Sequence, residues 1–434
     1  MTVFNALTPS QRRSLSLLFV AGLFFWSSTA SLLPTLPLYV EFVGGSDQQI
    51  GLVMGSFAIG LLLSRPTLGR WADARSRTLV LRVGTAVAAV APLGYLLVSS
   101  IPSLMLLRTF HGISIAAFTT AYSALVADLS PPQQRGELIG YMTLVTPLGV
   151  GLGPALGSFI QQGWGYPALF LTTATLGAVS GLCGWPLVEP PSFEVEASAR
   201  PPLEMSEGSG EMEADEGDSR EKPSTFWQLL ASPRVRVPTL VMLTVGLIFG
   251  TLTTFVPLHI KASSIDLNPG WFYTATAIAS FSMRLLAGQA SDRFGRGLFI
   301  SGALVCYALS MLTLVAADRS ALFLLAGFIE GMAAGILIPT TIALITDRSS
   351  PDERGRVFSI CVGGFDLGIA IAGPLLGSIA DYVSYSVLFA IAAALAVLAF
   401  TIFVTRNSKD LPHSLRFALG RERDIYAVRV ASSR

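Results

Sequence analysis

The feature that most constrains the fold of this chain is a repeat of its own residues at an offset of 219 positions. Eight residues recur at that spacing, most of them in short polar stretches between long apolar runs. The first copy contains Arg65, Gly69, Asp73, Gly112, Asp128, Pro132, Arg135 and Gly136, and the second contains Arg284, Gly288, Asp292, Gly331, Asp347, Pro351, Arg354 and Gly355. One fixed offset indicates a duplicated unit, and a duplicated bundle of membrane helices is a common way to build a transporter.

Composition indicates that lipid is the main solvent of this chain. Charged residues make up 13 % of it and hydrophobic residues 52 %, whereas soluble domains are roughly 25 % charged. A helix of about 20 apolar residues crosses a bilayer. Stretches of about this length lie at 14–42, 48–68, 78–98, 103–127, 137–160, 167–188, 237–260, 270–290, 297–316, 321–346, 356–380 and 385–405. We expect an all-α membrane protein with twelve transmembrane helices in two pseudo-symmetric six-helix bundles.

Neither a cleaved leader nor a metal site is predicted. The first apolar run follows two arginines, as a secretory signal does, but it continues to Phe42 and is longer than the apolar core of a signal. We therefore expect this span to be retained. Cys183, Cys306 and Cys361 all lie inside apolar runs, which supports neither a disulfide framework nor a metal cluster. No cofactor is expected.

The basic residues predict how the chain is oriented. With both termini in the cytoplasm, Lys261 and Arg319 fall in outer loops and Arg108 lies within a span, so the other 26 of the 29 Lys and Arg residues lie on or near the cytoplasmic side. Such a bias follows the positive-inside rule. We expect a multi-pass protein of a bacterial inner membrane, with both termini in the cytoplasm.

The chain divides into two bundles, a linker and a tail. The bundles are 1–189 and 237–405. Between them, 190–236 is acidic and rich in Glu, Ser, Gly and Pro, a composition that favours a flexible cytoplasmic linker. Its end at Thr225–Leu230 is predicted to be a short helix at the membrane interface. The basic tail, 406–434, is expected to be attracted to anionic lipid, and nucleic-acid binding is not needed to explain it.

Two loops carry a signature that resembles a known family. They read GQASDRFGR after the eighth span and GRWADARSR after the second. This is similar to the G-x-x-x-D-R/K-x-G-R/K loop of the major facilitator superfamily, which lies between helices two and three and recurs between eight and nine. In the first copy, Ala74 and Ser76 replace the basic residue and the glycine. The residues that carry the resemblance are Gly69, Asp73, Arg77, Gly288, Asp292, Arg293, Gly295 and Arg296.

These loops predict a latch. Asp73 and Asp292 stand at helix ends, where carboxylates can pair with arginines of neighbouring helix ends. Arg135 and Arg354 occupy equivalent loop positions in the two halves. Our hypothesis is that these four residues hold the cytoplasmic side shut when the bundle rocks outward. A solvated loop charge without a partner is the simpler alternative.

A glycine pattern in the fifth span resembles the motif that marks antiporters within this superfamily. Glycines four residues apart let helix backbones approach closely, and a proline kinks a helix. A bent, close-packed helix between the halves would seal the path against proton leakage. Ordinary helix packing would also explain the pattern. Its residues are Gly140, Gly149, Gly153, Pro154 and Gly157, with Ser158 where a second glycine is usual.

Four ionisable residues stand inside the spans, namely Arg108, His111, Glu330 and Asp366. Each would cost roughly 2.5–3.5 kcal/mol if it faced lipid at the bilayer centre, so each is expected to face protein or water. Glu330 occupies the repeat position of His111. The resemblance places Arg108, His111 and Glu330 near one another at a central cavity, because the fourth and tenth helices of the family line it.

The four residues divide by chemistry. An arginine is not deprotonated in proteins, so Arg108 would tune an acid or bind an anion. Glu330 and Asp366 are the candidate proton carriers. Two simpler readings stay open: Arg108 and Glu330 form a structural ion pair, and His111 is a packing residue.

The sequence favours transport over catalysis. It shows no Walker loop, no zinc-binding helix and no Ser-His-Asp arrangement, so neither an enzyme nor an ATP-driven pump is supported. The resemblance implies a monomeric, proton-coupled antiporter that exports a small amphipathic substrate. A sugar or metabolite carrier is the alternative within transport. A non-transporting receptor or assembly partner is the alternative from another class.

Overall fold

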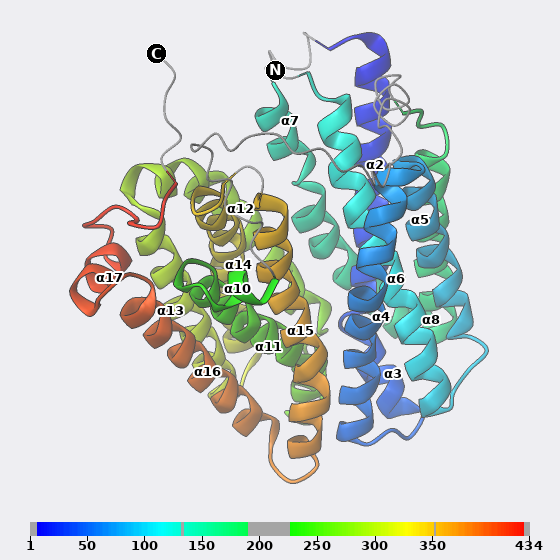
Figure 1. Ribbon diagram of the computed structural model, residues 1–434. Coiled ribbons are helices and arrows are strands. Elements are labelled where there is room, and N and C mark those ends of the chain that lie inside the picture. The colour runs from blue at the N-terminus through cyan, green and yellow to red at the C-terminus, as the bar shows by residue number, and fades with distance from the viewer. Residues whose placement is uncertain (1–6, 132–133, 190–225, 351–352, 429–434) are drawn as a thin grey trace, which may run out of the picture.

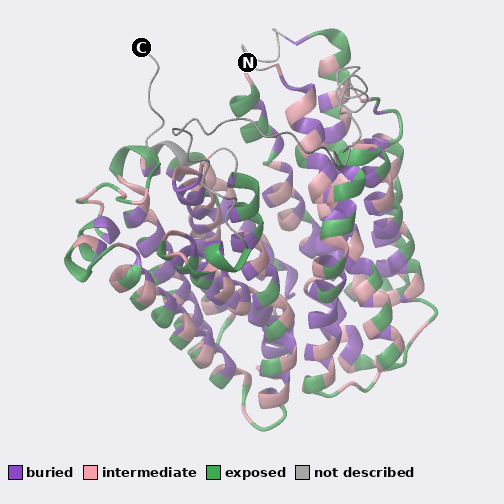
Figure 2. Cartoon of the chain, viewed as in Figure 1, coloured by how far each residue is buried: buried purple, intermediate pink, exposed green. Residues whose placement is uncertain are grey.

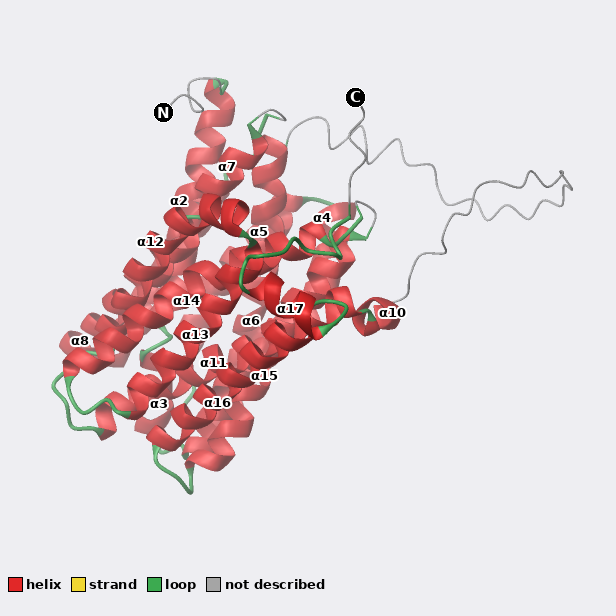
Figure 3. Cartoon of the chain, turned by 90° about the vertical axis from the view of Figure 1, so that its left-hand side faces the viewer, coloured by secondary structure: helices red, strands yellow, loops and turns green. Residues whose placement is uncertain are grey.

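The computed structural model describes residues 7–131, 134–189, 226–350 and 353–428, and within them the chain is helical and free of strands (Figures 1 and 3). Pro132, Pro351 and most of the predicted linker, 190–225, lie outside the described residues. The helices are α2 (Pro9–Ser31), α3 (Thr35–Phe42), α4 (Asp47–Ala74), α5 (Arg77–Gly94), α6 (Ile101–Leu129), α7 (Arg135–Met142), α8 (Val145–Gly184), α10 (Phe226–Ala231), α11 (Pro233–Ala262), α12 (Gly270–Phe294), α13 (Arg296–Val315), α14 (Ser320–Asp347), α15 (Arg354–Ala380), α16 (Tyr385–Arg406) and α17 (Leu411–Ala418).

The predicted twelve spans are confirmed, although two of them are merged in one long helix. Within the described residues, ten helical stretches are long and apolar enough to cross a membrane. The stretch Arg135–Gly184 has 50 residues and is interrupted at Gly165, whose φ of 80° is non-helical. The chain reverses there, because Gly157 lies against α2 near its end while Ser180 bonds Ala21, further back on α2. This stretch therefore supplies two spans, and α12 supplies the twelfth.

The helices form two halves that meet along two seams. The N-half contains α2 to α8 and the C-half contains α11 to α16, with buried residues on the faces between helices (Figure 2). One seam joins α4 to α15, and the other joins α8 to α12. In the first, a Cβ on Gly373 would lie 2.2 Å from the carbonyl oxygen of Gly51, so the two backbones touch. Glycine alone permits so close an approach.

Contacts between the halves close the end of the molecule that lies away from the start of α2 and from α17 (Figure 1). We call this end the opposite end. An ion pair of 2.9 Å and two side-chain hydrogen bonds of 2.8 Å cross between the halves here. The three contacts are Glu41 with Lys261, Gln162 with Asn268, and Asp47 with Tyr385.

At the terminal end, where α2 begins and α17 lies, the ion pairs of the described residues stay within a half. Arg77 pairs with Asp128 in the N-half. In the C-half, Arg296 pairs with Asp347 at 3.0 Å. The structure is thus joined at the opposite end, and no described ion pair latches the halves at the terminal end.

A C-terminal clasp, residues 411–428, folds back on the C-half. Arg348, which is 1 % exposed, donates to both carboxylate oxygens of Asp424 at 2.6 and 3.0 Å. It also donates to the side chain of Asn407 at 3.1 Å. The backbone N–H of Val428 donates to the carbonyl of Asp347 at 2.8 Å. Much of the predicted basic tail is therefore part of the folded C-half, and α10 stands where the sequence predicts a short helix.

The acid stability of the C-half is expected to depend on Glu353. Burial alone would raise its pKa, but hydrogen bonds from Arg234 and Ser350 and the charge of Arg234 hold that pKa below its ordinary value of 4.5. A lowered pKa stabilises the folded state above pH 4.5, and this contribution is lost as the pH falls through the folded value. We expect Glu353→Gln to melt a few degrees below wild type at neutral pH and to converge with it in acid. A difference in melting temperature that persisted unchanged into acid would contradict this.

Candidate transport site

An ion pair between Arg65 and Asp366 crosses the seam between the halves. Arg65 belongs to α4 and Asp366 to the middle of α15, and their nearest oxygen and nitrogen atoms are 2.8 Å apart. The side chain of Asp366 is 8 % exposed and that of Arg65 is 29 % exposed. Arg65 is one of the repeated residues, but the sequence alone assigned it no role. The negative charge of Asp366 is therefore balanced by an arginine that belongs to the other half.

Glu330 lies in a separate cluster inside the C-half. Glu330 is 3 % exposed, and its carboxyl group lies near the hydroxyl of Thr276 on α12, which donates to the carbonyl of Gly327 at 2.9 Å. The phenols of Tyr273 and Tyr307 lie near enough to interact with it electrostatically. Among the described residues no Lys, Arg or His forms an ion pair with Glu330. A charged carboxylate buried without a counter-ion is costly, so this site suits a carboxyl group that carries a proton.

Arg108 and His111 lie together inside the N-half. The guanidinium of Arg108 stands 4.2 Å from the centre of the Phe57 ring, and Tyr95 lies beside it. The hydroxyl of Tyr95 is 3.4 Å from Nδ1 of His111. Both residues are buried, and Nε and Nη1 of Arg108 and Nε2 of His111 have no hydrogen-bond partner among the described groups. Unpaired donors on a buried cation favour a site for an acceptor or an anion.

The structure does not join Arg108 to Glu330. Within the described chain the two form no ion pair, so the reading of a structural pair between them is not supported. The repeat still relates their surroundings. Phe57 packs on His111 with 5.7 Å between ring centroids, and Thr276, which stands 219 positions after Phe57, lies near Glu330. The two halves thus contain related buried clusters with different chemistry, basic in one and acidic in the other.

The loop residues form bonds that the latch hypothesis did not name. In the part of the chain that the structure describes, Asp73 and Asp292 form no ion pair with Arg135 or Arg354. Asp292 instead lies 3.4 Å from Arg296, in the next turn. Asp73, Arg135 and Arg354 are exposed. Since the halves are not joined at this end, the latch stays a prediction for the other conformation.

Two ion pairs related by the repeat are present at the terminal end in place of the predicted latch. Arg77 pairs with Asp128, and Arg296 pairs with Asp347. Each residue of the second pair stands 219 positions after its counterpart in the first. Each pair ties the third helix of a half to the end of the fourth. Asp128 and Asp347 are both repeated residues, and their shared offset is the sequence signal that could have identified them as partners of Arg77 and Arg296. For Gly288 only its place within α12 is described.

The antiporter-type glycines pack inside the N-half rather than between the halves. A Cβ on Gly149 would lie 2.4 Å from that of Trp26, and one on Gly157 would lie 2.4 Å from the carbonyl oxygen of Ser31. Both contacts are with α2. The opposite face of the same helix meets the C-half, where Gly270 lies against the carbonyl of Pro154. The helix does stand between the halves, but Gly149, Gly153 and Gly157 serve its contact with α2.

This packing predicts a stability difference between two positions of the motif. A Cβ on Gly153 would lie 2.5 Å from the carbonyl oxygen of Ser27, whereas one on Gly140 would meet nothing within 4 Å. We expect Gly153→Ala to destabilise the protein by about 1–3 kcal/mol through overpacking. Gly140→Ala should be neutral or stabilising by up to about 1 kcal/mol, because alanine favours helix. Thermal unfolding in detergent measures both, and equal melting temperatures would refute the packing argument.

Comparison with known proteins agrees with this architecture. A sequence model of the Major Facilitator Superfamily matches residues 18–273 and 266–424. The staphylopine export protein of Staphylococcus aureus is 20 % identical over 406 residues, which cover 92 % of this chain and 97 % of that protein. A multi-drug resistance efflux pump, the PmrA homolog of Lactococcus lactis, is 24 % identical over 388 residues, covering 87 % and 91 %.

A solved structure shows the same fold. The crystal structure of the nucleoside transporter NupG superposes with a TM-score of 0.70 at 16 % identity, covering 91 % of this chain and 98 % of that one. At this identity the likeness concerns the fold alone. The family model, however, spans nearly the whole chain. The chain therefore belongs to the Major Facilitator Superfamily and is an integral, multi-pass membrane transporter of small molecules, not an enzyme.

Proposed function

We propose that the protein is a proton-coupled antiporter that exports a small amphipathic compound and works as a monomer. The Arg65–Asp366 ion pair carries this proposal, because a titratable carboxyl group there joins the two halves that must move. The export protein and the efflux pump among its relatives support the direction of transport. The bias of basic residues supports placing the terminal end in the cytoplasm of a bacterium, with the protein in its inner membrane.

In that orientation the end that the three contacts close faces away from the cytoplasm, and the Arg65–Asp366 pair belongs to a state in which Asp366 carries its charge. The carboxylate attracts Arg65 across the seam, and this attraction stabilises the present arrangement of α4 and α15. A proton on Asp366 removes the charge and with it most of the attraction. A proton on Asp366 and a substrate bound between the halves would both change the equilibrium between the same two conformations, so that binding of one alters binding of the other.

The buried clusters of the two halves would bind the substrate and a proton. Arg108 offers unpaired donors to a polar or anionic group of the substrate. Glu330 can hold a proton without a counter-ion beside it. When the halves rock outward, Asp73 and Asp292 would meet Arg135 and Arg354 and latch the cytoplasmic side.

The clasp would face the inner leaflet. Its Arg416, Arg421 and Arg423 are exposed and would attract anionic lipid.

The test is proton movement driven by substrate. In inverted vesicles energised by respiration, cationic dyes, sugars and organic anions are added in turn and the internal pH is followed. We expect proton release with one class of compound, and its loss in both Asp366→Asn and Glu330→Gln. Transport of a sugar without proton movement would favour the carrier alternative. No transport of any compound by folded, inserted protein would favour a receptor.

A further inference from the structure

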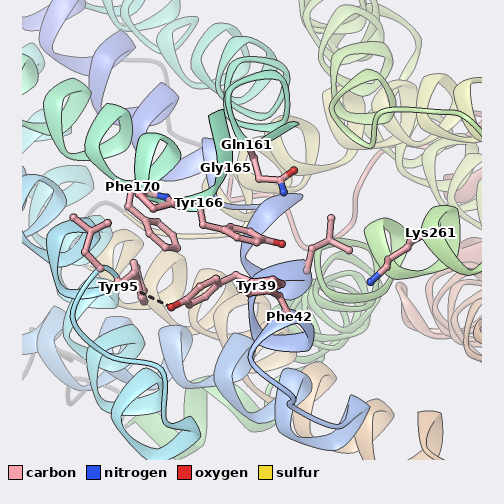
Figure 4. Close-up of a pocket in the computed structure, with 11 residues that line it drawn as sticks. Tyr39, Phe42, Tyr95, Gln161, Gly165, Tyr166, Phe170 and Lys261 are labelled. Atoms are coloured by element: carbon pink, nitrogen blue, oxygen red, sulfur yellow. Dashed lines mark hydrogen bonds between the residues drawn. The ribbon is translucent and has the colours of Figure 1, made fainter. Parts of the chain in front are cut away.

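A cavity at the opposite end of the molecule has no part in the mechanism above. Its volume is about 730 Å³, and small-molecule sites measure about 300–1,000 Å³. Eleven described residues line it, and of these Lys261 alone belongs to the C-half (Figure 4). The cavity therefore lies beside the contact between Glu41 and Lys261 that helps to close this end.

The reversal of the chain at Gly165 builds one wall of the cavity. Its φ of 80° lies in the left-handed region that favours glycine. Pro167 then restarts the helix with its fixed φ. This turn sets Tyr166 against Tyr39 of α3, with 5.0 Å between their ring centroids.

The apolar side of the cavity is fixed in place. The hydroxyl of Tyr39 donates to the carbonyl of Tyr95, the residue that caps α5, and to that of Val98 in the loop after it, both at 3.2 Å. A carbonyl at the end of a helix lacks a partner within that helix. The ring of Phe170 lies 5.0 Å from that of Tyr39 and 5.4 Å from that of Tyr95. A rigid aromatic wall costs little entropy when a ligand packs against it.

The other side of the cavity is rich in hydrogen-bond donors. Gln161, the hydroxyl of Tyr166 and the ammonium of Lys261 lie away from Tyr95 and Phe170 (Figure 4). An ammonium group has three donors, and Glu41 takes one of those on Lys261 at 2.9 Å. The side chain of Lys261 is 60 % exposed, so its other donors are open to solvent or to a ligand. The lining thus runs from aromatic rings to hydrogen-bond donors, which suits an amphipathic ligand whose polar end accepts hydrogen bonds.

We propose that this cavity binds an amphipathic aromatic carboxylate that arrives from the opposite end. The ring packs against Tyr39, Tyr166 and Phe170, and the carboxylate accepts from Lys261. Because Lys261 belongs to the C-half, the bound ligand adds a further contact between the halves at their closed end. By linkage it stabilises the conformation described here. The site is separate from the Arg65–Asp366 pair and from the two buried clusters, and its occupation does not depend on antiport.

Equilibrium binding of tritiated naphthoate to purified protein in nanodiscs tests the site. We expect saturable binding of one molecule per chain. Lys261→Gln removes the cation, and Leu96→Trp fills the cavity from the end of α5 without removing a polar group. Each is expected to weaken binding by at least about tenfold, and naphthamide should compete at least about tenfold more weakly than the acid.

Trp164→Ala is the matched control, because Trp164 is an aromatic residue next to Gly165, is 73 % exposed and does not line the cavity. It should bind naphthoate as wild type does. Binding that is equal in every variant, or that matches partition into empty nanodiscs, would overturn the site. Equal competition by naphthamide would overturn the carboxylate as its ligand.

The coupling to conformation has its own readout. Spin labels at Ala74 and Phe294, which are exposed at the terminal ends of α4 and α12, report the separation of the halves. Naphthoate at a hundred times its Kd should shift the population toward the long distance, by up to about 100-fold. An unchanged distance distribution at saturation would overturn the tie between the halves.

Discussion

Replacing Asp366 with Asn is expected to reduce proton-driven export by about 100-fold or more, the scale of effect when a proton-transferring group is lost. Asparagine keeps the shape of the side chain and can accept a hydrogen bond from Arg65, but it takes up no proton. Exchange of labelled for unlabelled substrate, which needs no net proton movement, should persist. Proteoliposomes with and without a pH gradient separate the two activities.

A matched substitution shows whether the effect belongs to the seam. Asp318 carries the same carboxylate, but it is 78 % exposed in the loop before α14, away from the seam. Asp318→Asn should leave both activities unchanged. Proton-driven export that survived Asp366→Asn would remove Asp366 from the coupling mechanism.

Replacing Gly373 with Ala is expected to open the opposite end. The new methyl group would lie 2.2 Å from the carbonyl oxygen of Gly51, so α4 and α15 must separate. Overpacking of this kind costs about 1–3 kcal/mol. A cost borne only by the closed state would raise the population open at this end by about 5- to 150-fold. Labelling of a cysteine at Leu36, which is fully buried on α3 where this helix packs against α11, would measure that population.

Gly363 provides the control on the same helix. A Cβ there would meet nothing within 4 Å, so Gly363→Ala should label at the wild-type rate. If both variants label alike, backbone contact at the seam does not govern closure of this end.

The spans were predictable because each is set by local composition. The apolar runs and the repeat gave their number and order, and even the reversal between the fifth and sixth spans falls in the predicted gap around Gly165. Local patterns decide where a helix begins and ends, and these are properties of neighbouring residues along the chain.

The partners of the charged residues were not predictable in this way. Arg65 and Asp366 lie in different halves, and their pairing depends on how α4 and α15 are rotated about their axes. Sequence periodicity does not fix that rotation in a helix that is apolar nearly all round. For the same reason the glycines of α8 were predictable as a close contact, but α2 was not predictable as the helix they touch.

The C-terminal clasp also sets an order of events during synthesis. Arg348 and Asp424 are 76 residues apart in the chain, which a ribosome translates in about 4–15 s. Through that interval the last two spans are made while Arg348 still lacks its carboxylate. The Arg348–Asp424 pair can therefore form only late, after the chain has been translated as far as residue 424. A truncated product that keeps all twelve spans but ends before Asp424 would leave the guanidinium at the end of α14 without its carboxylate, a chemical mark of an unfinished transporter.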